Sequence, residues 1–338
     1  MDAFDRLYGN ENLKKTLRGF ASRKAFPNCL IISGAEGSGK YTVATLCAMA
    51  VACENANSPC GECRSCSKID KGISPDVITV SVPKDRKTIG VDAVREIRNG
   101  AYIMPNDLSC KVYIIKNAEK MTEQAQNALL KIFEEGPQNT YFFLLAENSS
   151  SLLTTVRSRA PELKTELFSP RDLSELVTQN IKKAEELKKK DPVAFNRIIN
   201  VSGGSYGKAV ALIESKSKKS VSLHEKAEEL IDAMSKDNGS ELLLMLISES
   251  GDREKYTSLL QLAVTGLRDL CAVKRAQDES LLLFASREKA DELSERFSLK
   301  ALTSLTKCIN ELITDASHTN INLRTAAITA YGRIRDNK

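Results

Sequence analysis

The sequence predicts an α/β fold in which a parallel sheet with covering helices is followed by helical regions. Three observations support this prediction. Short apolar runs alternate with amphipathic segments over residues 1–165, a glycine-rich loop separates one strand from its helix, and from about residue 220 onward apolar residues recur at three- and four-residue spacing. Such alternation is typical of parallel sheets, whose strands are joined by helices.

The elements of the first region follow in order along the chain. Buried strands are predicted at residues 29–33, 76–80, 111–115 and 141–145. Helices are predicted after Asn10, after the glycine-rich loop, from Val91 and from Thr122. The last helix has a capping Thr at its start and Gly136-Pro137 at its end, which are common start and stop signals.

Two helical regions follow the sheet region. Ser169-Pro170 predicts a helix start, because a capping Ser before a Pro at the first helical position is favourable, and this smaller region ends near Lys216. The remaining helices are predicted at 242–247, 256–274, 299–313 and 321–334. We therefore expect three domains, at residues 1–165, 166–216 and 217–338.

Composition sets the class of protein. The chain has 338 residues, of which 42% are hydrophobic and 28% charged. Nothing in it resembles a signal peptide, and no apolar run is long enough for us to expect a membrane span. Nine cysteines without an export signal favour a reducing cytoplasm. The net charge of +5 permits nucleic-acid contact but does not predict it, and the basic stretch 182–190 contains Glu residues typical of a solvated helix.

The glycine-rich loop has the pattern of a phosphate-binding loop. Gly34, Gly37, Gly39 and Lys40 belong to a GxxxxGK motif between a predicted strand and a predicted helix, which is the context that the motif requires. Backbone N–H groups and the lysine of such a loop bind phosphates. The next residue is Tyr41, where the magnesium-binding Ser or Thr should stand, so ATP binding stays open and Mg²⁺ is not expected.

A second strand end supports the loss of hydrolysis. In an active ATPase, acidic residues that hold magnesium and orient water should follow the strand at 111–115. Lys116-Asn117 follow it here, and a cation and an amide can do neither. Two separate parts of the hydrolytic apparatus are therefore missing.

Four cysteines form a predicted metal site in the loop 53–66. Cys53, Cys60, Cys63 and Cys66 have the spacing C-x₆-C-x₂-C-x₂-C, which lets four thiolates reach one tetrahedral zinc ion. Four sulfur ligands leave no position for water, so the zinc would be structural. The alternative to a metal site is that these four cysteines are unrelated free thiols. The other five cysteines mostly lie in apolar stretches, which is typical of core residues.

Histidine chemistry is excluded from the sheet region by position. The two histidines, His224 and His318, both belong to the helical last third of the chain. A histidine-based catalytic centre in the sheet domain is therefore not expected, and the sequence contains no nucleophile elbow either.

The order of these motifs resembles the clamp-loader branch of AAA+ proteins. The phosphate loop, the four-cysteine insertion, Asn127-Ala128-Leu129-Leu130-Lys131-Ile132-Phe133-Glu134-Glu135 and Ser158-Arg159 carry the resemblance, which covers the whole chain. It implies an AAA+ P-loop sheet domain, a small helical lid domain and a C-terminal all-α collar domain for oligomerisation. Lys131 could then touch a DNA phosphate.

The resemblance also implies partners. Loaders of this family open a ring-shaped sliding clamp and place it on primed DNA, with ATP bound between neighbouring subunits. The expected partners are the tau/gamma and delta subunits of the bacterial DNA polymerase III holoenzyme and, transiently, the clamp and primed DNA.

The resemblance further implies particular residue roles. Arg159 matches the arginine of the Ser-Arg-Cys motif, which acts as a finger in a neighbour's ATP site, although Ala160 replaces the usual Cys. Gly207 stands where motor subunits carry the sensor-2 arginine, and Asn148 falls in the sensor-1 region. The losses at Tyr41, at Lys116-Asn117 and at Gly207 agree with the catalytically silent subunit of the loader, which has no turnover of its own.

Two other functions remain open from the sequence. One is an ATP-hydrolysing motor subunit of the tau/gamma type with a divergent site. The other is a zinc-bearing nucleic-acid-binding module, for which the cysteine loop and its surroundings offer Arg64, Lys68 and Lys71 against Glu54, Glu62 and Asp70.

Overall fold

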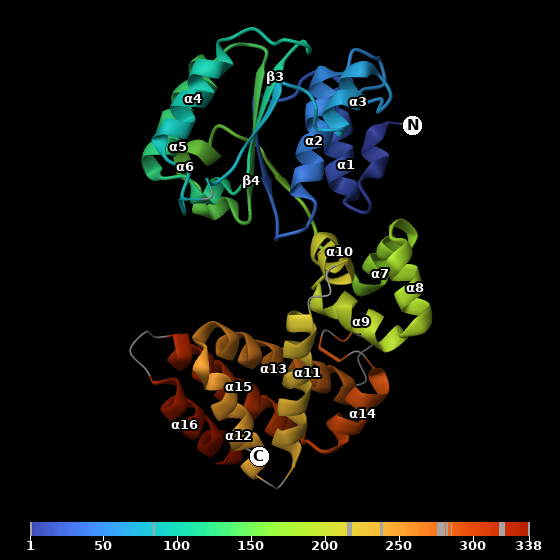
Figure 1. The fold of residues 1–338 in the computed structure, drawn as a ribbon, viewed down its shortest axis with the longest axis vertical. Helices are drawn as coiled ribbons and strands as arrows, with labels where there is room; N and C mark the ends of the chain where they lie inside the picture. Colours follow the sequence, from blue (N-terminus) through green and yellow to red (C-terminus); the bar gives the residue numbers. More distant parts are fainter. Residues whose placement is uncertain are drawn as a thin grey trace. The chain divides into compact units, whose positions relative to one another are not determined.

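The protein divides into two compact units, Met1–Phe168 and Ser169–Lys338 (Figure 1). The computed structural model describes residues 2–83, 85–214, 218–236, 239–275, 281, 283–284, 286–317 and 322–336. The first unit is α/β and the second is helical in its described part, which confirms the predicted fold class. The expected lid–collar boundary near residue 216 lies outside the described residues, so the three-domain division stays a prediction.

The first unit is built on a five-stranded parallel sheet with the order β2-β3-β4-β1-β5. The strands are β1 (Cys29–Ser33), β2 (Val77–Val80), β3 (Lys111–Ile115), β4 (Thr140–Ala146) and β5 (Glu162–Lys164). β1 lies between β4 and β5, with Ser33 opposite Ala146 and also opposite Lys164. The four predicted strands are confirmed. β5 was not predicted, because a single apolar side chain in three residues gives no periodic signal.

Helices cover both faces of the sheet (Figure 1). On one face lie α1 (Glu11–Ser22), α2 (Lys40–Ala52) and α3 (Arg64–Asp70), and on the other α4 (Val91–Ala101), α5 (Glu123–Glu135) and α6 (Thr154–Arg157). Successive strand residues point to opposite faces, so Leu30 and Ile32 join the first helical layer and Ile31 the second. Both layers exclude water, which explains why β1 and β3 are buried throughout.

Short 3₁₀ turns complete the first unit. They are η1 (Ala3–Arg6), η2 (Ala118–Lys120) and η3 (Ser149–Ser151). The predicted cap of α5 is present, because the Thr122 hydroxyl accepts the N–H of Ala125 at 3.2 Å.

The second unit is a set of packed helices. They are α7 (Pro170–Asn180), α8 (Lys182–Lys190), α9 (Pro192–Val201), α10 (Tyr206–Glu214), α11 (Lys218–Ser235), α12 (Gly239–Ser248), η4 (Glu249–Gly251), α13 (Arg253–Lys274), α14 (Arg287–Glu295), α15 (Leu299–Ser317) and α16 (Leu323–Asp336). Ser169 caps α7 as predicted, accepting the N–H of Asp172 at 3.2 Å. α13 packs against α11, α14 and α15 and forms the centre of this unit's core. Among the helices described, none is long and apolar enough to cross a membrane.

A buried carboxylate holds the loop that leads into β3. Asp76 is fully buried and accepts the N–H groups of Asn106, Asp107 and Leu108 at 2.8, 2.7 and 2.9 Å. Burial alone would raise the pKa of Asp76, but these three donors and the charge of Lys111 outweigh it, so the pKa lies below its usual range. The charged form is therefore the one that the fold stabilises.

We predict that Asp76→Asn lowers the free energy of unfolding of the protein by about 3 kcal/mol at pH 7, because a buried N–H is left facing an amide donor. The depressed pKa means that the stabilisation is present above the ordinary carboxyl pKa of about 3.9 and is lost as the pH falls below it. Urea unfolding between pH 7 and pH 3 measures both effects.

The matched control is Asp107→Asn on the same loop. Asp107 makes an ion pair with Lys68 at 2.8 Å near the surface, and such pairs contribute at most about 1 kcal/mol. Equal losses for the two variants would contradict the special role of Asp76.

Candidate functional site

The glycine-rich loop joins β1 to α2, as the motif predicts. Gly34, Gly37 and Gly39 have φ of 152°, 73° and 91°, a region that favours glycine. A Cβ at Gly34 would lie 2.0 Å from the Thr165 hydroxyl. The hydroxyl of Thr165, the residue after β5, also lies 2.6 Å from the hydroxyl of Ser38 and so forms a hydrogen bond with the glycine-rich loop.

Lys40 is folded back onto its own loop. Its Nζ donates to the carbonyl oxygens of Gly34 and Ala35 at 2.6 and 2.8 Å. Burial lowers the pKa of Lys40, and the carboxylates of Glu147, Glu119 and Glu36 act in the opposite direction. An incoming phosphate would have to replace two carbonyl contacts and approach these carboxylates.

Tyr41 and Lys116 contact each other beside the loop. The Nζ of Lys116 lies 4.0 Å from the centroid of the Tyr41 ring, which is a cation–π geometry. Tyr41 is 44% exposed, and its hydroxyl lies 3.5 Å from that of Thr79 on β2. Neither side chain offers an oxygen anion to Mg²⁺, and the cation of Lys116 repels it. Tyr41 and Lys116, which replace two expected magnesium ligands, therefore contact each other.

Two carboxylates that the sequence did not predict, those of Glu119 and Glu147, lie at this edge of the sheet. The N–H of Glu147 donates to Glu119 at 3.3 Å, and the amide of Asn117 donates to the other oxygen of Glu119 at 3.4 Å. Glu147 directly follows β4, so the rule that ligands gather at the carboxyl ends of parallel strands could have found it. Glu119 lies in η2 and has no comparable signal.

Asn148 has a local structural role in this structure. Its side-chain oxygen accepts the N–H of Ser150 at 2.9 Å and thereby caps η3. Gly207 lies in the first turn of α10 in the second unit. The role of either residue towards a nucleotide stays a prediction.

Arg159 lies just after α6 and is held by α5. Its Nε donates to Oε1 of Glu134 at 2.5 Å, and its Nη1 donates to the carbonyl of Thr155 at 3.2 Å. The side chains of Arg159 and Glu134 are 42% and 50% exposed. The guanidinium is thus oriented and still accessible, which is what a contribution to another chain would require. Lys131 is also exposed on α5.

The four predicted cysteines come together and could bind a metal ion. Their sulfur atoms all lie within 4.8 Å of one another, with Cys53–Cys60 at 3.7 Å and Cys60–Cys66 at 3.9 Å. Four thiolates around zinc at about 2.3 Å place their sulfurs roughly 3.8 Å apart, so the donor set fits tetrahedral zinc. Burial raises the pKa of Cys60, but the N–H groups of Glu62 and Cys63 outweigh it and lower it to about 6. That thiol is already close to the ionised form that binds metal.

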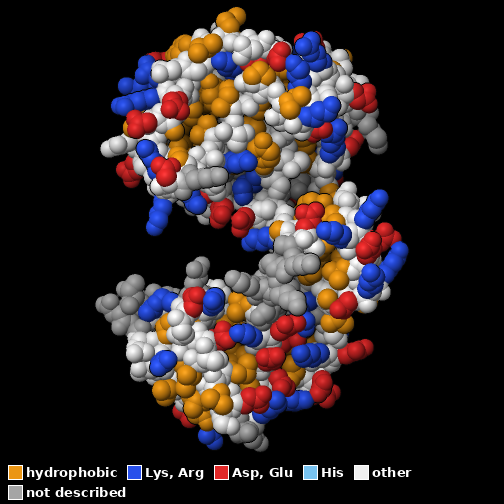
Figure 2. Space-filling model, viewed as in Figure 1, with side chains coloured by type: hydrophobic (Ala, Val, Ile, Leu, Met, Phe, Trp, Pro, Cys, Tyr) orange, Lys and Arg blue, Asp and Glu red, His pale blue; other side chains and the backbone are white. Residues whose placement is uncertain are grey.

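The cysteine loop also anchors the start of the chain. The N–H of Ala3 donates to the carbonyl of Pro59 at 2.7 Å, and Arg6 pairs with Asp70 at 3.0 Å. Asp70 and Lys68, which pairs with Asp107, therefore have their charges compensated within the fold. On the face drawn in Figure 2, basic and acidic side chains are interspersed. This arrangement does not favour a nucleic-acid surface on the loop.

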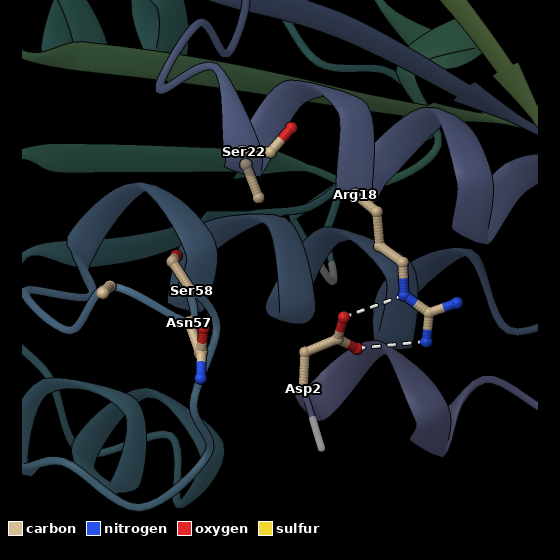
Figure 3. A pocket seen from close by; sticks show the side chains of 7 residues that line it. Asp2, Arg18, Ser22, Asn57 and Ser58 are labelled. Carbon is tan, nitrogen blue, oxygen red and sulfur yellow. Dashed lines mark hydrogen bonds and ion pairs between the residues drawn. The ribbon is translucent and has the colours of Figure 1, made fainter.

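A pocket of about 360 Å³ lies between α1 and residues 56–58 of the cysteine loop (Figure 3). Arg18 points into it, but its Nε and Nη2 donate to Asp2 and Asp5 at 2.8 and 2.5 Å. Two carboxylates compensate this one cation, so the pocket does not offer a site for phosphate.

The histidines are remote from this chemistry in the sequence. His224 is buried in α11 of the second unit, and His318 lies outside the described residues. The first unit contains no histidine, so its chemistry rests on Lys, Arg, Glu and Cys.

Comparison with known proteins supports the motif assignment. A family model described as DNA polymerase III, delta subunit, matches residues 9–168. DNA polymerase III subunit tau from Bacillus subtilis (strain 168) is 35% identical over 158 residues, which are 46% of this chain and 28% of tau. DNA polymerase III subunit delta' from Haemophilus influenzae is 38% identical over 133 residues, which are 39% of this chain and 40% of that relative. The chain therefore spans less than half of either relative.

One solved structure, a DNA polymerase III gamma subunit-related protein from Thermotoga maritima, has a TM-score of 0.43 and 18% identity over 96% of this chain and 98% of its own. A likeness at this level carries no argument about function.

We predict that the purified protein carries one zinc ion per chain, measured by elemental analysis, and that Cys60→Ser or Cys63→Ser removes it. Cys271→Ser, which alters a thiol of the second unit, is the matched control and should keep full zinc. Zinc-free protein with nine reactive thiols, or equal zinc in all variants, would show that the cluster is not a metal site.

Proposed function

We propose that the chain is a subunit of a DNA polymerase III clamp loader, because a family model described as DNA polymerase III, delta subunit, matches residues 9–168 and the relatives include tau and delta' subunits. We propose further that it is the delta-prime type. It hydrolyses no ATP itself, and it supplies Arg159 to the ATP site of a neighbouring tau/gamma subunit while the loader places a sliding clamp on primed DNA. Tau/gamma and delta subunits are its partners in this proposal, and zinc on the four cysteines is structural.

One observation carries the silent-subunit part of this proposal. Lys116 rests on the ring of Tyr41 at 4.0 Å, at the place where an intact site needs a hydroxyl and a carboxylate for magnesium. Phosphoryl transfer depends on such a metal to compensate developing charge. A site that offers a cation and a phenyl ring instead lacks this stabilisation. Nucleotide binding at Gly34, Gly37, Gly39 and Lys40 without turnover remains compatible with it.

A motor subunit of the tau/gamma type is the second candidate. The 35% identity to a tau subunit over 46% of the chain favours it, whereas the 38% identity to a delta' subunit over 39% of the chain favours the first candidate. The loss of the magnesium ligands favours the silent subunit, and direct measurement of turnover separates the two. The nucleic-acid module has no specific support, since ion pairs compensate Lys68 and Asp70 beside the cysteine loop.

We predict that the isolated chain hydrolyses ATP no faster than its Lys40→Ala variant, with or without primed DNA, because Tyr41 and Lys116 stand at the positions of the usual magnesium ligands. Steady-state phosphate release measures this. Turnover clearly above the Lys40→Ala background would make the motor reading the better one.

We predict that Arg159→Ala in a reconstituted loader lowers turnover at the adjoining ATP site by about 10³-fold or more, the usual contribution of an arginine finger. The other sites keep their own fingers, so the effect is measured as lost amplitude of single-turnover phosphate release. The matched control is Arg157→Ala, which removes an exposed arginine two residues earlier. Loss of activity in both variants, or in neither, would contradict a specific role for Arg159.

A further inference from the structure

Two side chains of helix α5 form hydrogen bonds with the segment that carries Arg159. Gln126 is 3% exposed, and its side-chain oxygen accepts the N–H of Leu153 at 2.8 Å. Its amide nitrogen donates to the carbonyl of Met121 at 3.3 Å, which fixes its orientation. Glu134 lies eight residues further along the helix, about 12 Å away at 1.5 Å per residue, and holds Arg159. α5 therefore contacts the segment 153–159 at both of its ends.

Packing in the core fixes the backbone of the segment 153–159. Val156 is fully buried, and Leu152 and Ala160 are 3% and 4% exposed, all in the same core as Leu129 and Ile132 of α5. Protein cores are densely packed and resist displacement. Core packing therefore fixes the position of the Arg159 Cα. It does not fix the direction of the Arg159 side chain.

The contacts of the guanidinium set that direction. Nε donates to Glu134 at 2.5 Å, and Nη1 donates to the Thr155 carbonyl at 3.2 Å and to the Ser158 hydroxyl at 3.3 Å. Nη2 donates to no group of the described chain. Nε and Nη1 are thus occupied by the described part of this chain, and Nη2, which shares an edge of the guanidinium with Nε, is available to an external anion.

We infer that Glu134 is a positioning residue for Arg159: its carboxylate holds Nε and so presents Nη2 to the phosphates of a neighbouring subunit's ATP. The inference rests on the proposed function, since it concerns how the finger is aimed. The carboxylate contacts Nε, and among the described residues Nη2 has no partner, so Glu134 directs the guanidinium while Nη2 stays available. An arginine without this contact would sample several rotamers and spend little time in the productive one.

The neighbouring residue provides a matched control. Glu135 has the same side chain on the same helix and is exposed, but successive helical residues point about 100° apart. The described contacts of Arg159 do not include it. Glu134→Ala and Glu135→Ala therefore remove the same group, one with and one without the contact.

The test uses a reconstituted loader and single-turnover hydrolysis at the adjoining site over a range of ATP concentrations. We expect Glu134→Ala to lower the maximal rate about tenfold or more, with the half-saturating ATP concentration changed less than twofold. Glu134→Gln keeps an oxygen that accepts from Nε, so it should recover most of the rate. Glu135→Ala should match the unaltered loader.

A second readout examines the contact itself. In a nitrogen-15 NMR spectrum of the full chain, the Nε–H signal of Arg159, assigned with Arg159→Lys, should move towards that of free arginine in Glu134→Ala. It should stay in place in Glu135→Ala. An unchanged melting temperature verifies folding, since the pair is half exposed.

The outcomes separate the inference from the proposed function. If Arg159→Ala leaves turnover unchanged, the finger role fails and the inference fails with it. If Arg159→Ala abolishes turnover but Glu134→Ala has no effect, only the inference is overturned. A faster rate in Glu134→Ala would identify the carboxylate as a restraining counter-ion, which also overturns it.

Discussion

The parallel pairing of β1, β3 and β4 is the constraint on which the site depends. Ser33 lies opposite Ala146, and Ile115 opposite Leu144, so the strands end near one edge of the sheet. The residues that follow them, the glycine loop, Lys116 and Glu147, therefore lie at that edge whatever side chains they carry. The buried strands determine the position, and the residues beyond their ends determine the chemistry. Magnesium ligands can consequently be lost without cost to the core.

Much of the fold could be predicted, because the strands buried on both faces are continuous apolar runs and the helix caps are local signals. Thr122 and Ser169 each cap a helix through their own hydroxyl. β5 and α3 could not be predicted, each for a different reason. β5 is too short for a pattern, and α3 begins inside the cysteine loop, where the Sγ of Cys63 accepts the N–H of Cys66 at 3.4 Å.

The site was predictable where motifs are local and not where contacts are tertiary. The glycine loop and the cysteine cluster have fixed spacing, and the structure brings each together as expected. The contact of Lys116 with Tyr41 joins residues that are far apart in the sequence, although each was singled out by itself. Glu119 and the role of Glu134 needed the folded chain, since acidic residues in helices and turns are common and carry no signal alone. Glu147 directly follows β4 and could have been found from the strand pattern.

The interactions that hold the nucleotide loop in place without a ligand would suit the proposed role, in which this subunit presents an arginine to its neighbour. Lys40 is bound by Gly34 and Ala35, and Ser38 by Thr165, so the loop is satisfied internally without a ligand. Electrostatic stabilisation of a transition state is greatest when the stabilising group does not reorganise during the reaction. A chain that does not cycle between nucleotide states does not move its own core with such a cycle. In the proposed function, Arg159, fixed by that core and by Glu134, would meet each ATP of the neighbouring subunit in one orientation, so a chain without turnover of its own would still support catalysis in that subunit.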